Sequence, residues 1–561
     1  MTPLSITLLL FASAQSVGGG SDNLHQFFGI DNHDQLGSSL ANAGDVDSDG
    51  FDDIVVGSPR RDQGGLADSG IALVYSGRSG SQLYFLAGAN AEDQFGYAVS
   101  GGGDLNRDGF DDILVGAPYA DPNGLANAGS AYVYSGQDGS LMYQWDGEVL
   151  NSAFGTSVSL AGDLNSDGFD DVLIGSPNAD LGTNIEPGAV YAYSGLDGSL
   201  LYRWIGNQDY GGFGWSVAGG GHLNADSVAD VIIGSPFVYL GSSFFDGTVS
   251  TYSGSDGAFI QEWSGGNGEA LGYSVSHAGD LNNDGFGEIL VGAYSASTNG
   301  LSKNGTAYAY SGIDGSTLYQ WNGSADNDGF GYSVSGVGDV DLDGTLDVLI
   351  GVPFTDQGGL TNAGSSSLYN GNNGSLLYEW QGSHEHGHFG LAVSGAGHSN
   401  DDPYDDVMIG SPSFDTPSKV NIGAAFVYTW SPFLRTETET ISASSAQIIS
   451  LDLDFPSDVS NGEYRVLFSA TGTGSFTHGV EIPLSLDALV VNSYFGNYPF
   501  PLSGDLQGNL DFSGNTIAEF GKTPGNFTGS VGRTFWVAAI ASQPGNVPQH
   551  SSVAVAITIT P

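Results

Sequence analysis

The stretch FGYAVSGGGDLNRDGFDDILVGAP, residues 95–118, decides the fold of this chain. It opens with an aromatic residue and a glycine, continues as a short alternating strand, turns through an acidic loop and ends in an apolar run. The opening pair occurs seven times at intervals of 58 or 59 residues, and a fixed period of this kind indicates a repeat architecture. The seven pairs are Leu36-Gly37, Phe95-Gly96, Phe154-Gly155, Phe213-Gly214, Leu271-Gly272, Phe330-Gly331 and Phe389-Gly390.

Each repeat contains four short segments of strand character separated by turn-forming residues. In the second repeat these segments are 95–100, 113–118, 129–135 and 141–145. Four such strands form one small antiparallel sheet, which cannot bury both of its faces alone. Seven sheets stacked around an axis cover one another and leave only short edges. We therefore predict an all-β chain in which residues 21–430 form a seven-bladed β-propeller with four antiparallel strands per blade.

The two ends of the repeat region indicate how the ring closes. The seventh repeat ends with GAAFVYTW at 423–430 and has no fourth strand of its own. The segment LHQFF at 24–28 precedes the first repeat at the offset that a fourth strand has elsewhere. We expect this N-terminal segment to supply the fourth strand of blade 7.

Five repeats carry an acidic loop between their first two strands. Oxygen-bearing side chains occupy loop positions 1, 3, 5 and 9, and glycine occupies position 6. Ca²⁺ takes about six to eight hard oxygen ligands, and the glycine permits the sharp bend that turns alternate side chains inward. Turn preference also favours Asp, Asn and Gly, but it does not explain four ligand positions repeated five times. With a backbone carbonyl at position 7, the predicted metal ligands are Asp45, Asp47, Asp49, Phe51 and Asp53; Asp104, Asn106, Asp108, Phe110 and Asp112; Asp163, Asn165, Asp167, Phe169 and Asp171; Asp280, Asn282, Asp284, Phe286 and Glu288; and Asp339, Asp341, Asp343, Thr345 and Asp347.

The loops of repeats 4 and 7 depart from this pattern. Both begin with histidine, His222 and His398, and the position-6 glycine is replaced by Ser227 and Pro403. Losing the first carboxylate and the glycine together is expected to abolish calcium binding. The cofactor prediction is therefore about five Ca²⁺ ions, in blades 1, 2, 3, 5 and 6.

The Phe-Gly pair, the acidic loop and the Gly-Ala-Pro element at 116–118 together resemble FG-GAP repeats, over about residues 24–430. Gly-Ser-Pro replaces the last element at 57–59, 175–177, 234–236 and 410–412. FG-GAP repeats form the propeller of integrin α-subunits and of many bacterial surface proteins. The resemblance implies that calcium rigidifies the hairpin between the first two strands of a blade. It also implies that ligands meet the opposite face of the ring.

Charge and composition narrow the class of partner. The chain has 63 acidic residues against 11 Lys and Arg, a net charge of −52, and no cysteine. Such a surface repels nucleic acid and anionic lipid, because phosphate binding needs clustered cations. Residues 1–14 have the apolar centre and small-residue end of a signal peptide, which predicts a secreted or cell-surface (cell-envelope) location. No other run approaches the length of a membrane span.

Beyond residue 430 the repeat stops and alternating strands follow at 446–455, 463–472, 534–541 and 551–560. We interpret residues 436–561 as a C-terminal β-sandwich of roughly seven short strands.

The leading functional hypothesis is a calcium-binding adhesion or recognition protein whose partner is a glycan or an extracellular or surface protein. The alternatives are a secreted polysaccharide- or ester-cleaving enzyme built on the same ring, and a structural component of the cell envelope. No catalytic constellation is recognisable, so we expect no enzyme activity. The run 384–388, with three histidines, is either a transition-metal site or a polar loop. The candidate sugar-stacking aromatics are Tyr119, Phe237, Tyr239, Phe244, Phe245 and Phe354.

Overall fold

The structure is a computed structural model. It describes residues 17–240, 245–400 and 402–432, and beyond these only the strands given below. One compact unit lies within residues 22–429, and a second includes the chain beyond Trp430. The regular structure of the described residues is β-strand apart from one short 3-10 turn, η1 (Pro122–Gly124). The predicted all-β class is confirmed.

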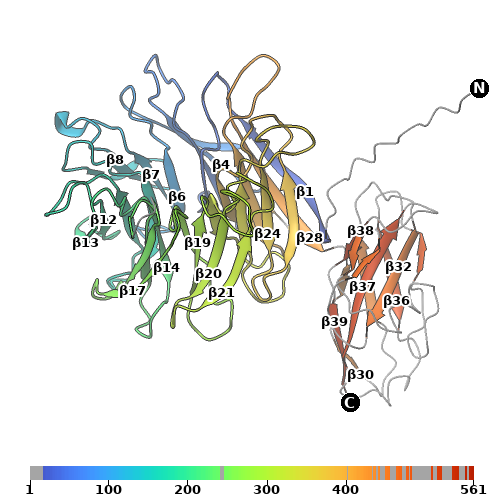
Figure 1. Cartoon of the computed structure of the whole chain (residues 1–561). Helices are drawn as coiled ribbons and strands as arrows, with labels where there is room; N and C mark the ends of the chain where they lie inside the picture. The colour runs from blue at the N-terminus through green and yellow to red at the C-terminus, as the bar shows by residue number, and fades with distance from the viewer. Residues whose placement is uncertain are drawn as a thin grey trace, which may run out of the picture. The chain divides into compact units, whose positions relative to one another are not determined.

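Seven four-stranded antiparallel sheets make up the first unit, and we call them blades 1 to 7 (Figure 1). Blades 1 to 3 are β2 (Ser39–Gly44), β3 (Asp53–Ser58), β4 (Ile71–Tyr75) and β5 (Gln82–Ala87); β6 (Ala98–Gly103), β7 (Asp112–Ala117), β8 (Ser130–Tyr134) and β9 (Leu141–Asp146); and β10 (Ser157–Gly162), β11 (Asp171–Ser176), β12 (Ala189–Tyr193) and β13 (Leu200–Ile205). Blades 4 and 5 are β14 (Ser216–Gly221), β15 (Asp230–Ser235), β16 (Thr248–Tyr252) and β17 (Phe259–Ser264); and β18 (Ser274–His277), β19 (Glu288–Ala293), β20 (Thr306–Ser311) and β21 (Thr317–Asn322). Blade 6 is β22 (Ser333–Gly336), β23 (Val348–Val352), β24 (Ser365–Tyr369) and β25 (Leu376–Gln381), and blade 7 is β26 (Val393–Gly397), β27 (Asp406–Ser411), β28 (Ala424–Pro432) and β1 (Val17–Phe28).

The first strands of the blades form a closed inner ring. Each one contacts the first strand of the next blade, and β26 returns to contact β2. The second strands lie between neighbouring sheets, and β3, β7 and β11 are buried along their whole length. Burial on both faces explains why the second strands are continuous apolar runs, whereas the outer strands β5 and β9 have one buried residue each and are otherwise half-buried or exposed.

Two positions of the repeat require glycine because the backbones of neighbouring blades are in contact there. The Phe95 amide donates to the Ser69 carbonyl of the preceding blade at 3.0 Å. A Cβ on Gly96, where φ is +84°, would lie 2.2 Å from the Ile71 carbonyl oxygen, and a Cβ on Gly57 would lie 2.1 Å from the Gly96 oxygen. The Phe-Gly pair and the glycine before the Ser-Pro or Ala-Pro element therefore permit one close inter-blade contact.

The ring closes as predicted, because β1 pairs with β28 as the outer strand of blade 7. The Phe27 ring stacks on Tyr75 of blade 1 with 3.9 Å between centroids. The backbone amides of Gly29 and Leu36 donate to the carbonyls of Gly423 and Ile422 at 3.0 and 3.2 Å. The N-terminal strand thus joins the last blade to the first.

The outer-strand tryptophans also join blades. The indole Nε1 of Trp145 in blade 2 donates to the Gly198 carbonyl of blade 3 at 3.0 Å, and Trp204 makes the matching bond to Gly257 at 2.9 Å. Trp263 and Trp321 repeat it in blades 4 and 5. These rings are buried and serve inter-blade packing.

The second unit is described only in part. Its strand β37 pairs with β32, β38 and β39, and β31 lies between β29 and β36. Its two-layer arrangement and its 436–561 boundary stay predictions, and residues 1–14 lie outside the described part of the chain. Among the described residues, no helix has the length and apolarity needed to cross a membrane. The strands are β29 (Leu434–Thr436), β30 (Thr440–Ser442), β31 (Ile449–Asp454), β32 (Glu463–Ser469), β33 (Phe476–His478), β34 (Val480–Ile482), β35 (Gln507–Asn509), β36 (Asn515–Phe520), β37 (Thr534–Ser542), β38 (His550–Ser552) and β39 (Val555–Thr560).

Candidate metal centres

Each acidic loop connects the first and second strands of its blade and is held by its own carboxylates. In blade 1 the amides of Asp49 and Gly50 donate to the two oxygens of Asp45 at 3.0 and 2.9 Å. The Phe51 amide donates to Asp49 at 3.1 Å. The same three bonds recur in the four other predicted calcium loops. The five loops therefore share one backbone conformation.

The position-9 acid anchors the loop to the body of the blade. Asp53 is fully buried, and its two oxygens accept the amides of Val46 at 2.9 Å and of Gly77 at 3.0 Å. Gly77 lies in the turn between the third and fourth strands, so this carboxylate ties two turns together. The remaining oxygen lone pairs of Asp53 face the loop.

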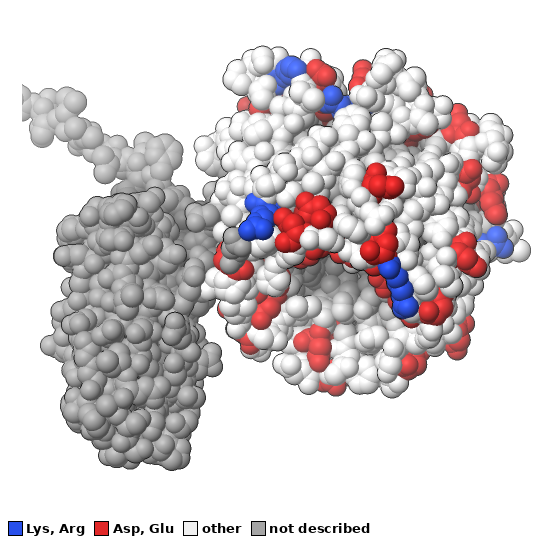
Figure 2. Space-filling model, turned by 180° about the vertical axis from the view of Figure 1, so that it is seen from behind, with Lys and Arg blue, Asp and Glu red and all other residues white. Residues whose placement is uncertain are grey.

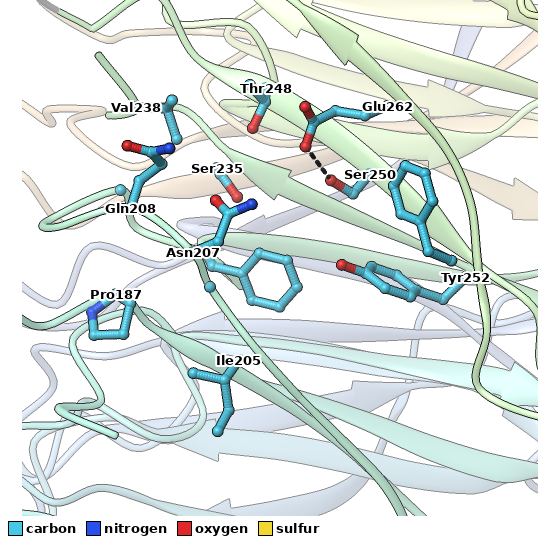
Figure 3. Close-up of a pocket in the computed structure, with 14 residues that line it drawn as sticks. Pro187, Ile205, Asn207, Gln208, Ser235, Val238, Thr248, Ser250, Tyr252 and Glu262 are labelled. Atoms are coloured by element: carbon cyan, nitrogen blue, oxygen red, sulfur yellow. Dashed lines mark hydrogen bonds between the residues drawn. The ribbon is translucent and has the colours of Figure 1, made fainter. Parts of the chain in front are cut away.

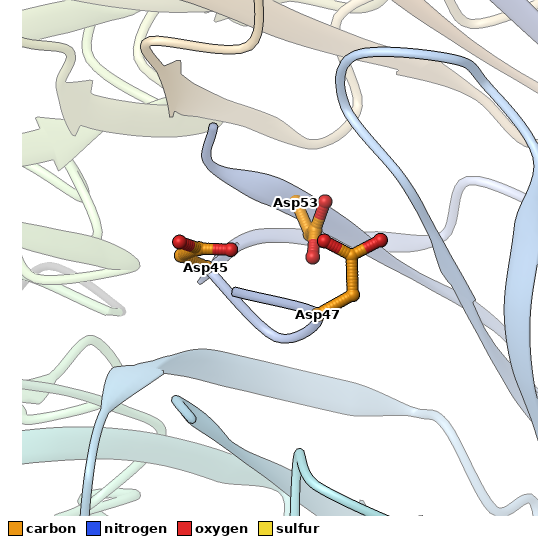
Figure 4. A group of neighbouring side chains, drawn as sticks. All are labelled: Asp45, Asp47 and Asp53. Carbon is orange, nitrogen blue, oxygen red and sulfur yellow. The ribbon is translucent and has the colours of Figure 1, made fainter. Parts of the chain in front are cut away.

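The structure brings three of the predicted carboxylates together in blades 1, 5 and 6, whereas those of blades 2 and 3 do not form such a group among the described residues. Asp45, Asp47 and Asp53 each offer an oxygen within 4.8 Å of the others (Figure 4). The same holds for Asp280, Asp284 and Glu288 in blade 5 and for Asp339, Asp341 and Asp347 in blade 6. Carboxylate oxygens gathered at this spacing are suitable ligands for a hard divalent cation.

Blades 2 and 3 use an amide oxygen where blade 1 has a carboxylate. The side-chain oxygens of Asn106 and Asn165 each accept a position-5 amide at 2.8 Å, as Asp47 does at 3.2 Å. An amide oxygen is also a calcium ligand, although it adds no charge. These two loops offer the same donor skeleton with one negative charge fewer.

Burial raises the pKa of the anchoring carboxyls. It raises the pKa of Asp53 to about 7, and the nearby Asp47 charge adds to the effect. Asp112, Asp171 and Glu288 likewise have a pKa of about 7, mainly because of burial. In the absence of a cation, crowded carboxylates are disfavoured in the ionised form, and a bound divalent ion removes that penalty.

The position-6 glycine is needed for its backbone conformation. Gly50 has φ of +89°, and a Cβ built on it would meet no atom within 4 Å. In blade 4 Ser227 adopts the same left-handed region with φ of +62°, which costs a non-glycine residue about 1 kcal/mol or more. The ring of Pro403 in blade 7 holds φ near −65° and excludes that conformation.

The loops of blades 4 and 7 satisfy their acids with hydroxyl and amide donors. In blade 4 the Ser253 and Ser255 hydroxyls donate to Asp226 at 3.1 and 2.7 Å, and the first position is His222, whose Nδ1 lies 3.0 Å from the Val228 carbonyl. In blade 7 the Thr429 hydroxyl donates to Asp402 at 3.0 Å. Among the described residues, neither loop gathers three acidic or imidazole ligands.

The position-7 residues have a second role in two of the loops. The Arg78 guanidinium carbon lies 4.6 Å from the centre of the Phe51 ring, and that of Arg107 lies 4.4 Å from the Phe169 ring. Arg107 belongs to the loop of blade 2 and Phe169 to that of blade 3, so this cation–π contact links neighbouring loops. Ligation by the position-7 carbonyls stays a prediction.

The position-8 acids, which the sequence reasoning passed over, also connect the loops. Asp111 of blade 2 accepts the amide of Asp45 in blade 1 at 2.9 Å, and Asp405 of blade 7 accepts that of Asp339 in blade 6 at 2.8 Å. Asp52 of blade 1 closes the series by accepting the His398 amide at 2.9 Å. Two consecutive acids at positions 8 and 9 were the sequence signal for this contact. Only one of the two side chains can point into its own loop, so the other is free to reach the neighbouring loop.

The histidine run at 384–388 is a turn and not an extended segment. His386 and His388 have φ of +56° and +52°, so the three rings do not share one side. The His384 ring packs on Phe414 with 3.8 Å between centroids, and His388 packs on Phe354 at 5.6 Å. These rings are not among the described groups of converging metal ligands.

The ends of the first strands away from the acidic loops surround the central channel. Four of the residues that follow the repeat's paired glycine are aromatic and half-buried there: Tyr97, Trp215, Tyr273 and Tyr332. Tyr273 contacts Trp215 and Tyr332 with centroids 5.5 and 4.8 Å apart, and its hydroxyl donates to that of Tyr332 at 2.9 Å. We call this group the channel-mouth aromatics. Sequence reasoning missed them, although an aromatic residue after the glycine in four repeats was visible.

A second tier of rings supports the channel mouth. Tyr119 packs on Tyr97, Phe237 on Trp215 and Phe354 on Tyr332, with centroid separations of 6.1, 4.9 and 5.6 Å. Phe245 packs against Phe237 and Tyr239, and Phe244 lies outside the described residues. Three of the predicted upper-loop aromatics therefore act with residues of the channel mouth.

Comparison with known proteins agrees with this geometry. The FG-GAP repeat model matches residues 36–75, 95–134, 154–193, 271–310 and 330–369, which lie in the five blades with complete acidic loops. The chain is 32% identical to integrin alpha-5 of Xenopus laevis over 217 residues, 36% of this chain and 20% of the relative. It is 30% identical to integrin alpha-3 of Mus musculus over 216 residues, again 36% of this chain and 19% of the relative.

The match to integrin alpha-V of Gallus gallus is 28% over 214 residues, covering 36% of this chain and 20% of that protein. The matched region thus spans about a fifth of the length of these relatives. Seven blades, five repeat matches and these relatives agree with one another: the chain carries an FG-GAP β-propeller similar to that of integrin α-subunits.

Proposed function

We propose that this chain is a calcium-stabilised extracellular recognition protein whose propeller binds a surface or matrix protein through the channel-mouth face. The observation that carries the proposal is that the first strands have aromatic residues at one end and acidic loops at the other. Strand β6 begins beside Tyr97 at the channel mouth and ends at Asp104 in an acidic loop. One face of the ring is thereby suited to cations and the other to a partner.

Calcium is the cation that the loops suit best. Each complete loop offers three or four side-chain oxygens on a short turn, and the position-7 carbonyl and water complete a shell of about seven ligands. Mg²⁺ demands a smaller octahedral site and keeps several of its waters, which suits so many protein oxygens less well. Five complete loops imply five ions, in blades 1, 2, 3, 5 and 6.

The opposite face favours a protein partner with an exposed cationic side chain. Trp215 and three tyrosines surround a hollow of about 300 Å³, and aromatic faces attract Lys and Arg. The molecule is strongly acidic, and Figure 2 shows acidic side chains spread over the visible face of the propeller with few basic ones. Its field therefore draws a basic partner toward the ring. A glycan is the alternative ligand, and the exposed rings of Tyr239 and Phe245 are the candidates for stacking on a sugar.

The relatives named above are integrin subunits, which supports a secreted or cell-surface location and an adhesion role for this propeller. The catalytic alternative rests on the general ability of propellers to host active sites. We propose recognition without catalysis, because no residue pair of the channel mouth offers a nucleophile with an activating base.

The test is binding of the purified full chain to an array of matrix proteins and glycans, in calcium and in chelator. We expect calcium-dependent binding to one or more basic proteins, lost in the variant Trp215→Ala/Tyr273→Ala and kept in Leu141→Ala, which changes an exposed outer-strand residue. Binding that survives the double substitution would place the partner elsewhere. Binding to glycans alone would replace the protein partner with a sugar, and turnover of a polysaccharide or ester would favour the enzyme alternative.

A further inference from the structure

Four of the third strands carry a pair of rings, whereas blades 1, 4 and 6 have only the second ring, with Leu73, Ser250 and Ser367 in the place of the first. Blades 2, 3, 5 and 7 place two aromatic residues on the same face of this strand, and the rings stack with centroids 5.3 to 6.4 Å apart. Blade 4 keeps the second ring, Tyr252, but has Ser250 in the place of the first. The missing side chain is the starting point of this inference.

In a complete blade the first ring fills the space between the third strand and the repeat's phenylalanine. In blade 3 the Tyr191 ring meets Phe154 at 5.3 Å in a T-shaped contact and stacks on Tyr193 at 6.2 Å. Tyr191 is 4% exposed, so it is part of the blade interior. In blade 4 the corresponding Phe213 contacts Tyr252 at 6.2 Å, and no first ring stands between them.

A pocket occupies the vacated place. It lies where β16 and β17 face the connection from blade 3, and its volume of about 80 Å³ makes it a small pocket, suited to one side chain and not to a larger ligand (Figure 3). Phe213, Tyr252 and Phe259 provide aromatic walls. We call this pocket the blade-4 seat.

The polar rim of the seat corresponds to the groups that hold a tyrosine hydroxyl in the other blades. In blade 2 the Tyr132 side chain hydrogen-bonds Ser130, and Thr248 holds the Ser130 position in blade 4. In blade 3 Tyr191 hydrogen-bonds Arg203, which is its cross-strand partner. In blade 4 the cross-strand partner of Ser250 is Glu262, whose carboxylate accepts the Ser250 hydroxyl at 3.1 Å (Figure 3).

We propose that the blade-4 seat binds the side chain of a tyrosine presented by a partner protein. The guest ring would take the place of the first ring, stacked on Tyr252 and edge-on to Phe213. Its hydroxyl would donate to the Glu262 carboxylate, which now accepts the Ser250 hydroxyl. A carboxylate at the rim favours a phenol over a phenyl group, because the phenol supplies the donor that the acid needs.

The seat is independent of the channel mouth. None of the channel-mouth aromatics lines it, and none of the predicted calcium ligands does. Loss of binding at the channel mouth would therefore leave the seat intact, and the converse also holds. The proposed function and the seat can fail separately.

The probe is p-cresol, the tyrosine side chain cut at Cβ, together with the capped tripeptide acetyl-Gly-Tyr-Gly-amide. Ligand-observed NMR and thermal denaturation are measured on the calcium-loaded full chain. We expect saturable one-to-one binding of both probes in the millimolar range and at least threefold weaker binding of toluene. Glu262→Ala should remove this preference for the phenol while toluene still binds.

Two matched substitutions decide the location. Ser250→Tyr restores the ring of the other blades and should abolish binding while leaving the melting temperature equal or higher. Tyr191→Ser in blade 3 opens the equivalent seat, and it should lower the melting temperature and raise the p-cresol stoichiometry from one to two. If that variant fails to fold, Ser250→Tyr and Glu262→Ala alone decide the question.

Binding of p-cresol that persists in Ser250→Tyr would overturn the proposal, as would the absence of saturable binding by the wild-type chain. Binding of p-cresol without binding of the tripeptide would overturn the partner-protein source and leave a pocket for small phenols.

Discussion

The acidic loops of blades 1 and 4 occupy equivalent positions in the ring but have different contents. Blade 1 places carboxylates at positions 1, 3, 5 and 9, whereas the loop of blade 4 keeps only Asp226 and Asp230. Both loops retain the buried position-9 acid, and in both it accepts the position-2 amide and the amide of the turn between strands 3 and 4. The position-9 acid is thus a structural element of both loops, while positions 1 and 6 distinguish the loop that is predicted to bind a cation.

The comparison also shows what replaces a cation. In blade 4 two serine hydroxyls donate to Asp226, whose pKa is lowered by these hydrogen bonds although burial opposes them. In blade 1 burial and neighbouring charges raise the pKa of Asp47. An acid whose ionised form is already stabilised needs no metal, whereas crowded carboxylates do.

The largest expected effect is the removal of calcium from all complete loops at once. A ligand present at about 100 times its dissociation constant stabilises a fold by about 2.7 kcal/mol per site, so five sites contribute on the order of 10 kcal/mol. Chelation at pH 7.5 should therefore lower the melting temperature of the propeller strongly, as followed by circular dichroism. Metal analysis of the loaded chain should find five calcium ions. An unchanged melt in chelator, or seven ions, would remove the distinction between the two kinds of loop.

The second effect is on the pH dependence of stability. The calcium-free chain should lose stability as the pH rises, whereas calcium should bind more tightly. The pKa values of Asp53, Asp112, Asp171 and Glu288 are raised to about 7 in the folded chain, so the folded state binds these protons more tightly than the unfolded state. Their contribution to the calcium-free chain is therefore complete below about pH 4 and is lost as the pH rises through 7.

Calcium competes with those protons, so its affinity should rise over the same interval. Denaturant unfolding in chelator, and calcium titrations at pH 5.5 and 7.5, measure the two trends. A calcium affinity that is equal at both pH values would contradict the assignment of the position-9 acids as ligands.

The third effect tests the structural role of position 9 where no metal is expected. Asp230→Ala leaves the buried amides of Leu223 and Gly254 without their acceptor, at a cost of about 3 kcal/mol in the free energy of unfolding. The loss should be the same in calcium and in chelator. A destabilisation that appears only in calcium would mean that blade 4 also binds the ion.

The fourth effect compares position 5 in the two loops. Asp49→Ala should lower the calcium count from five to four and cost about 2–3 kcal/mol in calcium but about 1 kcal/mol in chelator. Asp226→Ala removes the hydroxyl contacts of Ser253 and Ser255 and should cost about 1 kcal/mol under both conditions. Equal calcium dependence of the two variants would contradict the comparison.

The smallest effect comes from converting one loop into the other. His222→Asp with Ser227→Gly restores positions 1 and 6 of blade 4, and it should add a sixth ion with a gain of about 1–2 kcal/mol in calcium. Ser227→Gly alone should relieve its left-handed backbone without adding an ion. A count of five in the double variant would show that the position-3 amide of Asn224 does not suffice there.

Much of the fold was predictable because its blades correspond to a sequence repeat of fixed period. The pairs at Leu36 and its six equivalents, the loop spacing and the displaced strand at 24–28 predicted seven blades and their closure, all of which the structure shows. The acidic ligands were predictable for the same reason, since they belong to one short loop. What single repeats could not reveal is contact between repeats, such as the bond from the Asp45 amide to Asp111.

The repeat, the strands and the identity of the acids can be read from the sequence, because each of these is a local pattern of about ten residues. The tertiary structure alone decided that Tyr97, Trp215, Tyr273 and Tyr332 surround one channel. It also decided that position-8 acids link neighbouring loops and that Ser250 leaves a pocket instead of a filled interior. The physical reason is ring closure: packing brings together residues of different blades, and the character of such a group depends on neighbours that no local pattern names.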